Sequence, residues 1–114
     1  MRKSFLLVLI LAAAFPIGQA LAQGGGSDLL NEAVEEYNAN NLTRAALLFY
    51  EVKMTDTQAA NRAQAEYYLA QSLFKLGMYQ SALAYFNAVF VAGPAHPYYL
   101  KGAEGLIRVA EALK

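Results

Sequence analysis

The residues of this chain that could do chemistry are one histidine and a pair of glutamates. His96 is the only histidine and lies between Ala95 and Pro97, in a segment typical of a turn. A catalytic histidine needs an acid or nucleophile held beside it, so we expect His96 to be a solvated loop or capping residue. Glu32 and Glu36 are four positions apart and would share one helix face, where two carboxylates could act together. We favour a solvated helix face for this pair.

The remaining catalytic chemistries lack their residues. The chain contains no cysteine, so it has no thiolate to bind a metal or attack a substrate, and no disulfide. The sequence has no glycine-rich phosphate loop, nucleophile motif or metal-ligand constellation. We therefore predict that the protein is not an enzyme, with no catalytic residues, no metal and no cofactor.

The first 22 residues have the pattern of a secretory signal peptide. Basic residues at 2–3 precede an apolar run over 5–15, and the small-residue site Ala-Leu-Ala at 20–22 ends the segment. We predict cleavage after Ala22 and a periplasmic or secreted chain. An uncleaved anchor is the alternative, but a bilayer span needs about 20 apolar residues and Pro16 interrupts this run. No stable membrane anchor is expected after cleavage.

The charge pattern argues against a nucleic-acid partner. Nine Lys and Arg residues balance nine Asp and Glu residues in the full chain. Cleavage would remove two of the basic residues and leave a net charge of about −2. The remaining cations are scattered singly among carboxylates, whereas nucleic-acid binding requires a basic cluster. A protein or peptide partner is the expectation.

Hydrophobic periodicity predicts an all-α domain over residues 28–114. Residues 23–27 are Gly-rich and are interpreted as a linker. Beyond them apolar residues recur every three or four positions, which is typical of amphipathic helices. We predict helices over 28–39, 42–54, 58–76, 79–91 and 97–113, with N-cap candidates for the third at 55–57. The loops between them are short, so consecutive helices should pack antiparallel as hairpins.

A repeat relates residues 41–49 to residues 78–86. Ala45 and Phe49 in the first segment correspond to Ala82 and Phe86 in the second, 37 residues further on. A period of this length is typical of a solenoid of helical hairpins. Ala70 and Ala82 would let the two helices of one hairpin approach closely.

Residues 63–94 resemble one tetratricopeptide repeat, a helix–turn–helix unit. The family's places are occupied here by Leu69, Ala70, Leu73, Gly77, Tyr79, Ala82, Phe86 and Pro94. Glu66 and Val89 depart from the pattern, and in the weaker first unit Asn40 stands at the glycine place. The resemblance implies an α–α superhelix of antiparallel hairpins with about two and a half repeats. The longer period resembles that of repeats in bacterial cell-envelope proteins.

The resemblance implies a non-catalytic scaffold or adaptor of the bacterial envelope, which binds another protein. In this family the first helix of each repeat lines a groove. The groove-facing places here are Tyr37, Gln64, Tyr67, Gln71, Phe74 and Lys75, with Leu30, Val34 and Asn38 beside Tyr37. Aromatic rings mixed with amides suit a peptide or helix that carries apolar anchors. The alternative is that these residues pack against a neighbouring helix.

The last predicted helix leaves the solenoid unfinished. It carries an apolar stripe made by Tyr99, Ala103, Leu106, Ile107, Ala110 and Leu113. This stripe matches the first helix of a third repeat, and Leu100 and Val109 lie off it. Either the chain is the N-terminal part of a larger repeat protein, or its core is completed by a partner or by itself. A self-associating structural module is therefore the alternative function.

Overall fold

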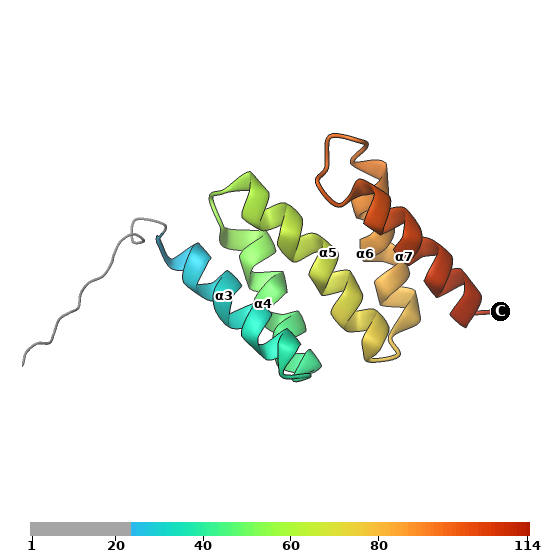
Figure 1. Ribbon diagram of the computed structural model, residues 1–114, viewed down its shortest axis with the longest axis horizontal. Coiled ribbons are helices and arrows are strands. Elements are labelled where there is room, and N and C mark those ends of the chain that lie inside the picture. Colours follow the sequence, from blue (N-terminus) through green and yellow to red (C-terminus); the bar gives the residue numbers. More distant parts are fainter. Residues whose placement is uncertain (1–23) are drawn as a thin grey trace, which may run out of the picture.

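The described part of the chain contains helices and no strands, which confirms the predicted all-α class. The computed structural model describes the backbone of residues 24–114 and the side chains from Asp28 onward. The helices are α3 (Gly24–Asn38), α4 (Leu42–Thr55), α5 (Ala59–Lys75), α6 (Tyr79–Val91) and α7 (Tyr99–Ala112) (Figure 1). None of these helices is long and apolar enough to cross a membrane.

The helix bounds agree with the predicted ones to within two residues, except at the start of α3. This helix begins at Gly24, so residues 24–27, predicted as a linker, form its first turn. In a first turn the carbonyl groups accept hydrogen bonds from the residues four positions on. A helix can therefore extend back through glycines despite their low propensity. The predicted signal peptide, residues 1–22, lies outside the described residues.

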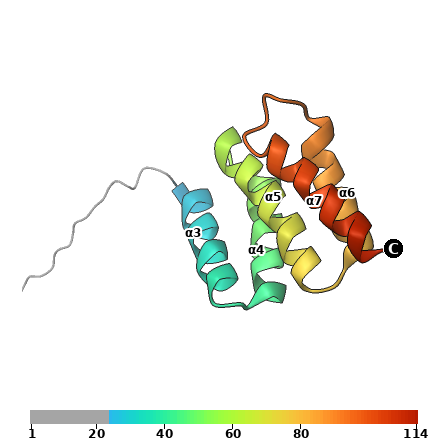
Figure 2. The same cartoon turned by 45° about the vertical axis from the view of Figure 1, so that its right-hand side comes forward.

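Successive helices pack side by side as antiparallel hairpins, from α3 to α7 (Figure 1). In addition α3 contacts α5, and α5 contacts α7. Helices α3, α5 and α7 therefore form one layer, and α4 and α6 form a second. In the turned view α7 passes in front of α6 (Figure 2). The predicted groove was assigned to the layer of α3 and α5.

The core lies between the two layers. Ala70 of α5 and Ala82 of α6 have no exposed surface, as expected for small residues at a close helix crossing. Phe49 and Phe86, the aromatic places of the two repeats, are also fully buried and belong to the same cluster. The alanines and the phenylalanines thus have the packing roles predicted for them.

The turns after α3 and α5 repeat each other bond for bond. Asn40 and Gly77, 37 positions apart, both have positive φ, 67° and 81°. The N–H groups of residues 40 and 41 donate to the carbonyls of 37 and 36, and those of 77 and 78 donate to 74 and 73. This is the Schellman pattern that ends helices at a left-handed residue. The backbone therefore has the 37-residue period at this turn.

Helix α7 packs through a different face from the predicted stripe. Its buried residues are Gly102, Gly105 and Val109, whereas Ile107 is 62% exposed. The stripe therefore does not form the contact with α6, because two glycines bring the α7 backbone itself against α6. A Cβ added at Gly102 would lie 2.7 Å from Cγ1 of Val89. At that distance either Val89 or the α7 backbone would have to move.

Candidate functional site

A cavity of about 280 Å³ lies where α3 and α5 meet above α4. Its lining residues are Val34, Tyr37, Asn38, Phe49, Gln64 and Tyr68. The structure thus brings together Tyr37 and Gln64 of the predicted groove with Val34 and Asn38 beside them. Sequence reasoning missed Phe49 and Tyr68. Phe49 was taken only as a core aromatic of the repeat, and Tyr68 lies next to the position that was chosen.

Three aromatic rings form the walls of this cavity. The Tyr37 ring meets Phe49 edge-on, with 6.2 Å between centroids, and meets Tyr68 edge-on at 5.3 Å. Phe49 and Tyr68 are stacked at 5.8 Å. The ammonium group of Lys75 lies 4.7 Å from the centre of the Tyr37 ring. Rings that hold one another in place give a cavity whose shape exists before any ligand arrives.

Tyr67, a predicted groove residue, lies instead in the core and is 7% exposed. Its ring stacks on Tyr98 with 5.1 Å between centroids and 10° between planes. Burial raises the pKa of the Tyr98 phenol, and the neighbouring Tyr68 and Tyr67 phenols raise it further. Tyr67 therefore supports the segment that leads into α7.

Gln71 and Phe74 are engaged by α7. The guanidinium of Arg108 donates a hydrogen bond to Oε1 of Gln71 at 2.7 Å and lies 5.6 Å from the centre of the Phe74 ring. These two predicted groove residues therefore serve the contact between α5 and α7 and do not line the α3–α5 cavity. Whether a ligand also reaches them stays a prediction.

The side chain of His96 is largely buried, contrary to the expectation of a solvated loop residue. Its side chain is 7% exposed, and Nε2 lies 2.9 Å from a carboxylate oxygen of Glu66. Its Nδ1 accepts a hydrogen bond from the N–H of Tyr98 at 3.0 Å. Tyr98 is the residue before the first turn of α7, so this bond holds the loop and does not cap the helix. Both ring nitrogens have partners, and the loop before α7 is tied to α5. This contact could not be predicted from local sequence patterns, because Glu66 lies 30 residues upstream of His96.

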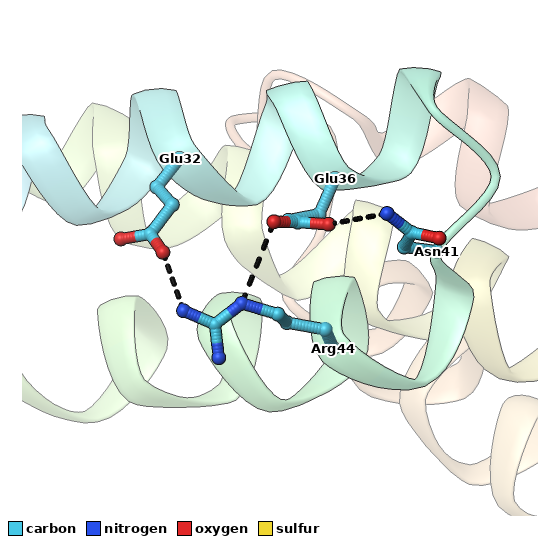
Figure 3. Close-up of polar contacts among 4 residues, drawn as sticks. All are labelled: Glu32, Glu36, Asn41 and Arg44. Carbon is cyan, nitrogen blue, oxygen red and sulfur yellow. Dashed lines mark hydrogen bonds and ion pairs between the residues drawn. The ribbon is translucent and has the colours of Figure 1, made fainter.

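Glu32 and Glu36 share one face of α3, as the spacing indicated, and Arg44 of α4 reaches both (Figure 3). Arg44 donates a hydrogen bond to Glu32, and its Nε lies 3.4 Å from Oε2 of Glu36. The side-chain amide of Asn41 donates to the other oxygen of Glu36 at 2.7 Å. The hydrogen bond to Glu32, followed by the charges of Glu32 and Glu36, raises the pKa of Arg44, although desolvation opposes the shift. The pair therefore joins α3 to α4.

A larger cavity of about 440 Å³ lies on the opposite layer, over α5 between α4 and α6. Its lining residues are Thr43, Ala46, Leu47, Tyr50, Leu69, Leu73, Leu76, Met78, Ser81 and Tyr85, none of which carries a charge. No group of three or more Asp, Glu or His side chains in residues 28–114 could hold a metal ion.

Comparisons with protein-family models, with curated proteins and with solved structures found no match. The resemblance to tetratricopeptide repeats therefore stays a prediction drawn from the residues.

Proposed function

We propose that the chain is a non-catalytic interaction module of tetratricopeptide type in the bacterial envelope. It binds a peptide or a helix of another protein at the α3–α5 cavity. The observation that supports the proposal is the coincidence of this cavity with predicted groove places, Tyr37 and Gln64, in a pocket walled by aromatic rings.

The lining of the cavity favours a peptide ligand that inserts one apolar side chain and forms hydrogen bonds through its backbone. The half-buried rings of Tyr37 and Tyr68, held in place by the buried Phe49, offer rigid apolar surface at little entropic cost. Such a surface suits an aromatic or branched aliphatic side chain of the ligand. Asn38 is exposed and Gln64 half-buried, and their amides can each donate and accept hydrogen bonds. They match the alternating N–H and C=O groups of a peptide, so the ligand is a peptide with one buried anchor.

The partners of the chemically reactive side chains support a non-catalytic role. Both ring nitrogens of His96 are engaged, one by Glu66 and one by the Tyr98 amide. The carboxylates of Glu32 and Glu36 are held by Arg44. Each candidate group for acid–base catalysis thus has a role in joining helices. The proposed location rests on the sequence of residues 1–22.

A displayed library of random peptides tests the proposal. Peptides selected on the purified chain should share one apolar anchor residue. Gln64→Arg, which fills the cavity with a longer charged side chain, should weaken their binding at least about 10-fold, the loss typical of a blocked anchor pocket. Gln80→Arg is the matched control, because Gln80 is exposed on α6 and away from the cavity.

Two results would contradict the proposal. One is a library that yields no peptide above background. The other is equal weakening by Gln64→Arg and Gln80→Arg, which would place the peptide elsewhere. Circular dichroism of each variant establishes that the helices are retained.

A further inference from the structure

The outer face of α7 is apolar and uncovered. The corresponding face of α5, 37 residues earlier, is covered by α6, and its residues Leu69, Ala70 and Leu73 are 3%, 0% and 8% exposed. At the matching places α7 has a half-buried Leu106, an exposed Ala110 and Ile107 at 62% exposure. Leu100 adds a further apolar side chain at 72% exposure. We call Leu100, Ala103, Leu106, Ile107, Ala110 and Leu113 the α7 face.

The other end of the helix row is polar. On α3, Asn31 and Glu35 are exposed. Glu32 and Glu36 form ion pairs with Arg44. Stacking the α7 face of one molecule on the α3 end of another would bury Glu35 against aliphatic side chains, which is costly for an unpaired carboxylate. Head-to-tail assembly is therefore disfavoured.

The α7 face also differs in shape from the α5 face that packs against α6. Ile107 stands where α5 has Ala70, and Leu100 stands where α5 has Ala63. Ala63 and Ala70 are 8% and 0% exposed, and α6 packs against α5. Larger side chains at both places require a wider separation between helix axes.

We propose that the α7 face pairs with the same face of a second copy, with the two α7 helices antiparallel about a two-fold axis. In this register Ala103 faces Ala110 of the other copy, Leu106 faces Ile107, and Leu100 faces Leu113. Each Ile107 then enters the gap between the two small alanines opposite. Large residues alternating with small ones across an interface are what knobs-into-holes packing needs.

The charges of α7 are compatible with this pairing. In an antiparallel pair the face contains no charged residue, and Glu104 and Glu111 lie at its solvent edge. Arg108 points away toward Gln71. Without residues 1–22 the chain carries a formal net charge of about −2, so long-range repulsion between two copies is weak at physiological salt. A two-fold contact uses one self-complementary patch and closes after two molecules.

Sedimentation velocity tests the pairing, using the chain purified from a bacterial host that processes export signals. We expect a monomer–dimer equilibrium with a micromolar dissociation constant, weakened at least about 10-fold by Ile107→Glu. Leu47→Glu is the matched control, since Leu47 is 66% exposed but lies on α4. A monomer at about 100 µM, an Ile107→Glu variant that still dimerises, or a dimer lost with Leu47→Glu would each overturn the proposal.

Cysteine crosslinking tests the register, because the natural chain has no cysteine. Ala103→Cys and Ala110→Cys replace small residues that face each other in the proposed pair, within the reach of a disulfide. Mixing the two variants under mild oxidation should give a crosslinked dimer, at least several-fold more than either variant alone. A crosslink formed equally well by Ala103→Cys alone would indicate parallel helices and overturn the register.

Discussion

Gly105 of α7 lies directly under the ring of Phe86. A Cβ added at Gly105 would stand 2.5 Å from Cε1 and 2.7 Å from Cγ of that ring. Phe86 has no exposed surface, so neighbouring atoms surround its ring and prevent it from moving aside. The contact between α6 and α7 is therefore made by a ring and a bare helix backbone, and its closeness depends on the absence of one methyl group.

Gly105→Ala should destabilise the fold. The added methyl group overpacks the Phe86 ring, which costs about 1–3 kcal/mol in a tight core. Alanine also brings a gain of about 1 kcal/mol over glycine inside a helix. The cost outweighs this gain because the buried Phe86 ring has no free space to shift into. Chemical denaturation followed by circular dichroism measures the difference. Unchanged or increased stability would show that Phe86 moves aside.

The left-handed turn residues predict opposite effects at equivalent positions. Asn40→Gly should raise the free energy of unfolding by up to about 1 kcal/mol, because glycine adopts positive φ without steric cost. Gly77→Ala should lower it by about 1–2 kcal/mol. Nothing lies within 4 Å of a Cβ added at Gly77, so this loss would be purely conformational. Stabilisation by Gly77→Ala would contradict the assignment of the turn.

Asp56 should be more important than its loop position suggests. It is 6% exposed, and its carboxylate accepts hydrogen bonds from the N–H of Gln58 at 2.7 Å and from Asn61 at 3.1 Å. Asp56→Ala removes both bonds in the turn before α5, whose N-cap Gln58 has no side-chain cap of its own, and should cost about 1–3 kcal/mol, the range for a buried group that loses its hydrogen-bond partner. The neighbouring Thr57→Ala, at an exposed position, should change the unfolding midpoint little. Equal effects of the two variants would rule out a stabilising role of the Asp56 carboxylate.

Tyr98 makes stability depend on alkaline pH. Its pKa is raised in the folded chain, so below about pH 10 both folded and unfolded chains hold the phenol neutral. Above that pH the unfolded chain loses the proton first, and stability falls until the folded pKa is reached. Tyr98→Phe should therefore flatten the decline in thermal midpoint between about pH 9 and about pH 11. Tyr50→Phe, at an exposed tyrosine, should leave the profile of the parent chain unchanged.

Local signals predicted the helices well, and long-range contacts limited the rest. Gly77 and Asn40 were identified as matching places of the repeat, and both adopt the positive φ that ends a helix. The buried face of α7 was missed because periodicity counts side chains, and Gly102 and Gly105 have none. The small-residue reasoning applied to Ala70 would have found them.

The candidate site shows the same limit. Tyr37 and Gln64 were brought to one cavity as the repeat spacing indicated. Gln71 instead binds Arg108, which lies one repeat period of 37 residues downstream, but equivalence in the repeat did not indicate that the two side chains would contact each other. The burial of His96 by Glu66 is likewise a contact between distant segments. Spacing within one repeat predicts which face a residue is on, but not which neighbour covers it.

The α3–α5 cavity draws its walls from three successive helices, α3, α4 and α5. It exists only while α3 is docked, and terminal helices of repeat proteins are the first to fray. A ligand held there would bind only the state with α3 docked, and would shift the equilibrium between docked and frayed α3 toward the docked state by mass action. Amide hydrogens of α3 would then exchange more slowly in the complex than in the free chain, and those of α7 would exchange at the same rate in both.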